Sequence, residues 1–66
     1  MDLLEIMETA IRAEVDAKNL YLKGEQTATA EDARALFRHL AREEEKHRQL
    51  LVAMYQEMTG KASTEW

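Results

Sequence analysis

Apolar and small residues recur at spacings of three and four along most of the chain, which is the period of an amphipathic α-helix. Two such stretches are separated by a short polar segment, residues 24–29 (GEQTAT). The pattern predicts one helix over about residues 2–25 and a second over about residues 30–59. Because the connection is short, the two helices should pack antiparallel as an all-α helical hairpin.

The residues at the predicted helix ends suit those positions. Asp2 is a favoured N-cap for the first helix, and Thr29 is expected to cap the second, with Asp32 as a loose capping-box partner. Proline is absent, and the two glycines, Gly24 and Gly60, lie where helices could stop. We therefore expect two nearly uninterrupted helices.

The chain is short for an independent fold. Its 66 residues amount to one small domain, and residues 60–66 carry no periodic pattern, so a flexible tail is expected there. A domain of this size buries too little apolar surface to offset its conformational entropy easily, so a partner, a metal or a disulfide should stabilise it. Cysteine is absent, which excludes disulfides and thiolate metal sites. Self-association remains, as does a metal bound by oxygen and nitrogen atoms.

Charge and hydropathy limit the classes of partner. Lysine and arginine total 9 against 13 acidic residues, and the net charge of −4 leaves no basic stripe for the phosphates of a nucleic acid. No apolar run approaches the roughly 18 residues of a membrane span, and the N-terminus lacks the basic start and continuous apolar centre of a signal peptide. We expect a cytoplasmic protein with neither nucleic acid nor membrane as partner.

Each predicted apolar stripe is interrupted by polar residues near its middle. In the first helix the interruption is Glu14, and in the second it is Glu44 followed by His47. The small and apolar members of the two stripes are Leu3, Met7, Ala10, Ala17 and Tyr21, then Ala33, Phe37, Leu40, Leu51, Met54 and Met58. In an antiparallel hairpin the two interruptions should lie at the same level, within about one turn.

The interrupting residues are types that bind metal ions. Glu44 and His47 are three residues apart, so their side chains share one helical face about one turn apart and could hold a common ion. Carboxylates buried in a core need compensation, which a cation would supply. A satisfied ion pair and a polar device that fixes coiled-coil register are the alternatives, because Glu-x-x-His alone is a weak signal.

Neighbouring charged residues are assigned no special role. Glu43, Glu45 and Lys46 fall off the stripe, where a solvated face explains them. The remaining basic residues considered are expected to be solvated or to form ion pairs between subunits: Lys18, Arg34, Arg42 and Arg48. His39 also lies off the stripe and is expected to be a functionally silent surface residue.

Two copies of the chain would complete a known arrangement of ligands. The four-helix dimetal carboxylate site takes a Glu from each of two helices and Glu-x-x-His from each of the other two. This chain contains one helix of each kind. A pair related by a two-fold axis would supply Glu14, Glu44 and His47 twice around two ions, and would also cover the apolar stripes.

Two segments, AIRAEVDAKNLY (10–21) and ALFRHLAREEEKHRQLL (35–51), resemble the first helical hairpin of the rubrerythrin branch of the ferritin-like superfamily. The shared features are a glutamate seven residues before a tyrosine and a later L-A-x-E-E-E/K-x-H run, and they span about two-thirds of the chain. A single hairpin most resembles the encapsulated ferritins. That resemblance implies a homodimer with a ferroxidase site at its interface, further assembly into a ring that is commonly a decamer, and an encapsulin shell as a candidate partner and location.

The resemblance also implies roles for individual residues. Glu14 would be the ligand from the first helix, Glu44 the bridging carboxylate and His47 the terminal nitrogen ligand, while Tyr21 would lie just behind these ligands or be a plain core aromatic. The implied activity is a di-iron ferroxidase that oxidises Fe(II) with O₂ or peroxide for iron storage or detoxification. It would hold two Fe ions per dimer, with Mn or Zn as substitutes. The alternatives are a rubrerythrin-like peroxidase and a non-catalytic metal-binding helical interaction module.

Overall fold

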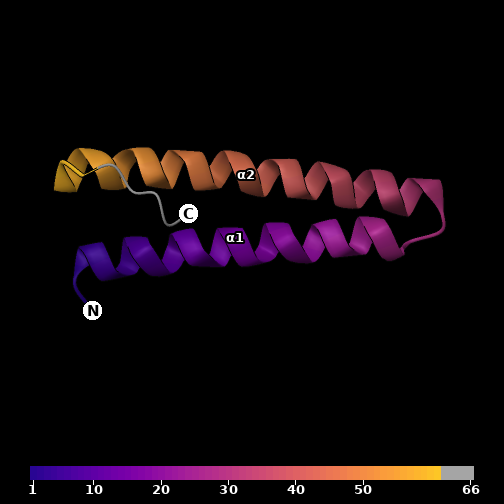
Figure 1. Ribbon diagram of the computed structural model, residues 1–66, viewed down its shortest axis with the longest axis horizontal. Coiled ribbons are helices and arrows are strands. Elements are labelled where there is room, and N and C mark those ends of the chain that lie inside the picture. Colours follow the sequence, from indigo (N-terminus) through magenta and orange to yellow (C-terminus); the bar gives the residue numbers. More distant parts are fainter. Residues whose placement is uncertain (62–66) are drawn as a thin grey trace.

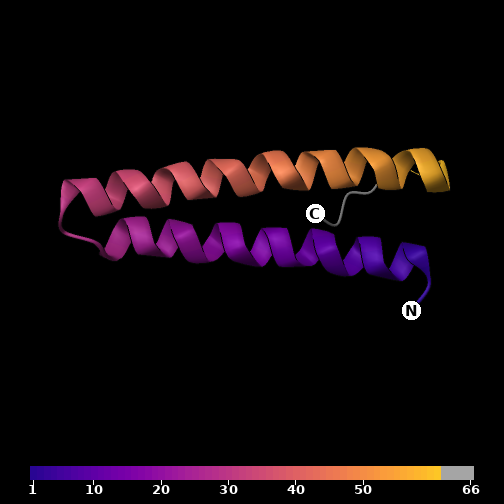
Figure 2. The same ribbon diagram turned by 180° about the vertical axis from the view of Figure 1, so that it is seen from behind.

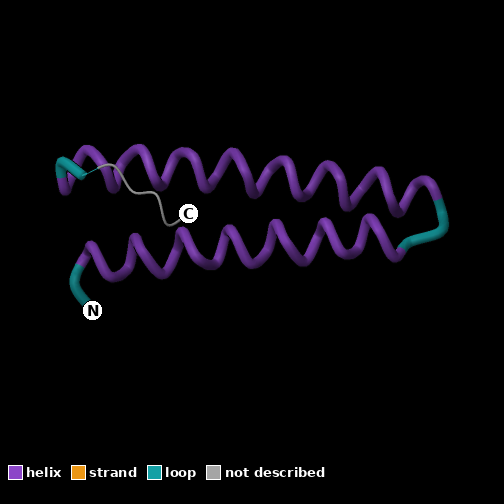
Figure 3. The backbone as a smooth tube through the Cα atoms, in the orientation of Figure 1, coloured by secondary structure: helices purple, strands orange, loops and turns teal. Residues whose placement is uncertain are grey.

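The computed structural model describes residues 1–61, which form two helices, α1 (Leu3–Thr27) and α2 (Glu31–Thr59). The helices lie side by side and antiparallel, joined at one end by residues 28–30 (Figures 1 and 2). Apart from the two helices and this connection, the described chain consists of short loops at its two ends (Figure 3). The predicted all-α hairpin is therefore confirmed, and no strand occurs in residues 1–61.

The start of α1 is fixed by the predicted cap. Asp2 accepts a hydrogen bond from the backbone N–H of Glu5 (2.8 Å), and the Glu5 carboxylate accepts one from the backbone N–H of Asp2 (3.3 Å). This reciprocal capping box satisfies two backbone donors that the first turn of a helix leaves unpaired. Asp2 as N-cap is confirmed.

The start of α2 differs from the prediction. Ala30 is the N-cap and provides no side-chain hydrogen bond, so Thr29 as N-cap was wrong. The Asp32 carboxylate accepts from the backbone N–H of the adjacent Ala33 (2.9 Å) and does not close a capping box. Glu31 and Asp32 place two acidic groups in the first turn, where they interact favourably with the positive end of the helix dipole.

The two glycines have different roles. Gly60 follows α2 with a left-handed backbone (φ 70°), and its N–H donates to the carbonyl of Gln56 (2.8 Å), so the predicted stop is confirmed. Gly24 does not end α1, which continues to Thr27, and that prediction was wrong. A Cβ at Gly24 would lie 2.8 Å from the ring of Phe37, so the glycine allows α2 to approach closely near the connection.

The two helices meet along a line displaced by one residue from the predicted stripes. Ile11 is completely buried and Ala41 is 4% exposed, and no other described residue is as fully enclosed. Their neighbours Ala10 and Leu40, which belong to the predicted stripes, are only half-buried. Each stripe therefore lies along one edge of the contact between the helices and remains partly open to solvent.

Neither helix in the described part of the chain is long and apolar enough to cross a membrane. Of the tail predicted over residues 60–66, the structure describes Gly60 and Lys61, and residues 62–66 lie outside the described residues.

Candidate metal centre

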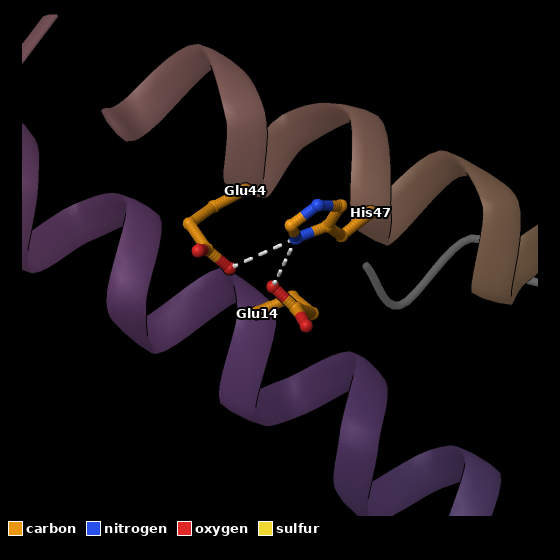
Figure 4. Close-up of side chains that lie close together, drawn as sticks. All are labelled: Glu14, Glu44 and His47. Carbon is orange, nitrogen blue, oxygen red and sulfur yellow. Dashed lines mark ion pairs between the residues drawn. The ribbon is translucent and has the colours of Figure 1, made fainter. Parts of the chain in front are cut away.

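Glu14, Glu44 and His47 meet at one edge of the contact between α1 and α2 (Figure 4). His47 Nδ1 lies 3.5 Å from Glu14 Oε2 and 3.7 Å from Glu44 Oε2. One potential ligand atom from each residue lies within 4.8 Å of the other two. The three residues predicted as ligands are thus brought together, and the register inferred from the interrupted stripes is the observed one.

The three side chains differ in their access to solvent. The side chains of Glu14 and Glu44 are 24% and 19% exposed, whereas that of His47 is 50% exposed. Glu14 Oε2 is buried and accepts no hydrogen bond from any described residue. A buried acceptor without a donor is unfavourable and rare in folded proteins. The geometry therefore leaves a carboxylate oxygen in need of a cation or another donor.

The donor set fits a divalent metal ion. Two carboxylates and one imidazole are ligands that suit Fe(II), Mn(II) and Zn(II). The carboxylate oxygen without a donor points into the same space as Glu44 and His47 (Figure 4). Three donors leave coordination positions open, so one chain provides half of the four-carboxylate, two-imidazole set of a dimetal helical bundle.

Exposed apolar residues lie on either side of this group along the hairpin. In steps of three and four, the line through Glu14 reaches Leu3 and Ile6, and the line through His47 reaches Leu36, Met54 and Met58. We call these five residues the apolar face. Because the two lines pass through candidate ligands that meet at one edge of the hairpin, the apolar face lies toward that edge, with the candidate ligands between its ends.

A second polar cluster surrounds Glu45. Its carboxylate accepts from Lys18 Nζ of α1 (2.9 Å), from Arg48 Nε and Nη2 (2.9 and 2.7 Å) and from Gln49 Nε2 (2.9 Å). Hydrogen bonds, chiefly the one from Arg48 and next the one from Lys18, hold the pKa of the Glu45 carboxyl well below its usual range. Assigning Glu45 to a solvated face, and Lys18 to solvent or another subunit, was wrong. The two form an ion pair between the helices of one chain.

Another ion pair joins the helices near their connection. Arg38 Nε donates to Glu25 Oε2 (2.7 Å), and this bond raises the pKa of the Arg38 guanidinium. Glu43 pairs with Lys46 on the surface of α2 (3.3 Å), as its assignment to a solvated face predicts. Neither the Arg38–Glu25 pair nor the Lys46–Glu43 pair includes a predicted ligand, so substitutions at these pairs can serve as controls.

Tyr21 packs against Phe37 near the connection. The two rings are stacked, with centroids 6.4 Å apart and planes inclined by 30°. Such stacking suits an aromatic residue at a helix contact, and the role of Tyr21 behind the candidate ligands stays a prediction. His39 is exposed on α2, where a surface position was expected.

A comparison with protein-family models matches the rubrerythrin model to residues 5–65. The chain belongs to the rubrerythrin family. The match covers nearly the whole sequence and includes all of α2, α1 from its third residue onward and all three candidate ligands. No curated protein and no solved structure matches this rubrerythrin-family chain. Family membership and the carboxylate–histidine group together indicate a ferritin-like protein that binds metal.

Proposed function

We propose that this rubrerythrin-family chain is a ferroxidase that works as a pair of hairpins. The observation that carries the proposal is the buried Glu14 oxygen, which lies beside Glu44 and His47 and has no hydrogen-bond donor among the described residues. An iron ion held there would supply the missing positive charge. The same three residues supply the oxygen and nitrogen donors that iron(II) accepts.

Pairing would complete the site and cover the apolar face. Each chain contributes two carboxylates, so a pair would bring four together, and two divalent ions would balance their charge. A two-fold axis beside the ligands would also bury Leu3 and Met54, which are 59% and 49% exposed in the single chain. Both requirements are met by one association.

The residues would act by position and charge. Glu14 and Glu44 would attract two Fe(II) ions and hold them near each other, with Glu44 placed between them and His47 as the nitrogen ligand at the outer side. Each Fe(II), as substrate, loses one electron. O₂ takes both electrons and two protons and leaves as hydrogen peroxide, so that two Fe(III) result. With hydrogen peroxide as oxidant, the two electrons and two protons yield two water molecules.

Oxidation of added Fe(II), followed by the absorbance of Fe(III) in air, tests the proposal. The protein should oxidise Fe(II) well above the buffer rate, and Glu44→Ala should return the rate to that of buffer. Glu43→Ala is the matched control, because Glu43 is the adjacent acid but pairs with Lys46 on the surface. A wild-type rate equal to buffer, or an unchanged rate in Glu44→Ala, would remove the enzymatic proposal.

Membership of the rubrerythrin family also favours a second candidate, a peroxidase that reduces peroxide. The chain has no cysteine for an electron-transfer centre, so this activity would need a separate electron donor. Turnover with peroxide and a chemical reductant, compared with turnover in O₂, distinguishes the two. Metal binding without turnover in either assay would favour the non-catalytic interaction module.

We further propose, from the resemblance to encapsulated ferritins, that pairs assemble into a ring and enter an encapsulin shell. Native mass spectrometry with Fe(II) would give the number of chains per assembly. Co-expression with a shell protein, followed by isolation of intact shells, would test encapsulation.

A further inference from the structure

Two of the ligands are followed, four residues later, by a basic residue. Lys18 follows Glu14 on α1, and Arg48 follows Glu44 on α2. A glutamate four residues before a lysine or arginine is the favourable orientation for an ion pair on a helix. Such pairs would neutralise the ligands. Neither forms, because within residues 1–61 Glu14 and Glu44 have ion-pair contacts only with His47.

Both basic side chains instead reach Glu45. Lys18 Nζ lies 2.9 Å from Glu45 Oε1, and Arg48 Nη2 lies 2.7 Å from Glu45 Oε2. Successive residues of a helix project about 100° apart, so Glu45 and Glu44 point to opposite edges of the contact between the helices. Glu45 and Arg48 are three residues apart, as Glu44 and His47 are, and each lies one residue later on α2. The Glu45–Arg48 pair therefore lies at the edge of the helix contact opposite the ligands.

We propose that Glu45 is a positioning residue that draws Lys18 and Arg48 away from the ligand carboxylates. This inference rests on the proposed metal site. With Glu45 in place, Glu14 Oε2 has no lysine or arginine paired with it within residues 1–61 and is available to a metal ion. Without the Glu45 carboxylate, the acid one turn away on the same helix is Glu14 for Lys18 and Glu44 for Arg48. An entering metal ion must then first displace the basic side chain from the ligand.

The test is a titration with Co(II), whose absorption spectrum reports the ligand geometry. Glu45→Gln should weaken Co(II) binding by about tenfold, the lower end of the effect of residues that support metal ligands. Removing both cations in that background, as Glu45→Gln/Lys18→Met/Arg48→Met, should restore the affinity to within about twofold of wild type. Glu25→Gln removes the partner of Arg38 in the other ion pair between the helices and should leave Co(II) binding unchanged.

Lys18→Met alone distinguishes this role from a simple clamp between the helices. If the Lys18–Glu45 pair served only to hold α1 and α2 together, Lys18→Met would weaken Co(II) binding. If Glu45 draws cations away from the ligands, this variant binds Co(II) as tightly as wild type or more tightly. The single variant also provides the test should Glu45→Gln fail to fold.

The failures of the two proposals are distinguishable. No Co(II) binding by the wild-type protein would overturn the metal site itself. Normal binding by wild type and by folded Glu45→Gln would overturn only the role of Glu45. Weak binding by Glu45→Gln that is not restored in the triple variant would also overturn that role, because a purely structural contribution cannot be recovered by removing two further ion-pair partners.

Discussion

Replacing the Glu14 carboxylate by an amide should stabilise the metal-free protein and abolish metal stabilisation. In Glu14→Gln the side chain keeps its size, loses its charge and gains an N–H that can donate to Glu44. The buried oxygen of Glu14 has no hydrogen-bond donor within residues 1–61 and lies close to a second carboxylate, and both features are unfavourable without metal. Residues that serve a metal site should therefore lower the stability of the apoprotein.

The structure gives the size of the expected effect. The carboxylates of Glu14 and Glu44 lie within 4.8 Å of each other, and like charges at that separation repel by about 3.5 kcal/mol at an effective dielectric constant of about 20. Solvent reaches 24% of the Glu14 side chain and 19% of Glu44, so we reduce this to about 1–2 kcal/mol. For a domain of this size, about 1 kcal/mol corresponds to about 4–8 °C in Tm. Glu14→Gln should therefore melt about 5–15 °C above wild type in EDTA.

Thermal unfolding followed by circular dichroism at pH 7.5 tests this, at one protein concentration because the Tm of an associating chain depends on it. Excess Mn(II) at about 100 times its Kd should stabilise wild type by about 2.7 kcal/mol and leave Glu14→Gln nearly unchanged, which reverses their order. Glu8→Gln, at a half-buried acid of the same helix, is the control and should change Tm little under either condition. A lower Tm for Glu14→Gln in EDTA would refute the reasoning, since the carboxylate would then stabilise the apoprotein.

Three further predictions concern the apolar face, the close helix contact and the cluster around Glu45. Met54→Glu places a charge on the apolar face and should shift the native mass from a pair to a single chain, whereas Ala53→Glu on the exposed surface of α2 should not. Gly24→Ala should lower the free energy of unfolding in urea by about 1–3 kcal/mol, because the new Cβ would meet the Phe37 ring at 2.8 Å; equal stability would mean that the ring moves without cost. In EDTA, wild type should be more stable than Glu45→Gln above about pH 5 and should lose this advantage as pH falls, because the folded pKa of Glu45 lies below its unfolded value; an advantage that persists in acid would contradict this.

Local signals predicted the helices and part of their ends. Asp2 and Gly60 were predicted correctly because a capping carboxylate and a left-handed glycine act through the adjacent backbone alone. Gly24 was misread because its role depends on Phe37, a residue from the other helix. A composition suited to a helix stop is ambiguous when a close tertiary contact also requires glycine.

The candidate site was predictable for a related reason. Glu14, Glu44 and His47 each interrupt an apolar stripe, and a hairpin with a short connection brings those interruptions to one level. The role of Glu45 was not predictable from the stripe, because its environment depends on the rotation of α2 against α1. The displacement of the helix contact by one residue, to Ile11 and Ala41, puts Glu45 beside Lys18 instead of in solvent. That the three residues bind metal stays a prediction.

The position of the apolar face, with the candidate ligands between its ends, has a consequence for how the proposed activity responds to dose. A hairpin that carries half of a reactive centre is inert alone, so the rate at low concentration should increase with the square of the amount of chain. Iron that bridges two copies would also oppose their separation on dilution. Cells that produce this chain sparingly would thus have almost none of the working unit, and a modest rise in synthesis, or in free iron, would produce a disproportionate rise in oxidising capacity.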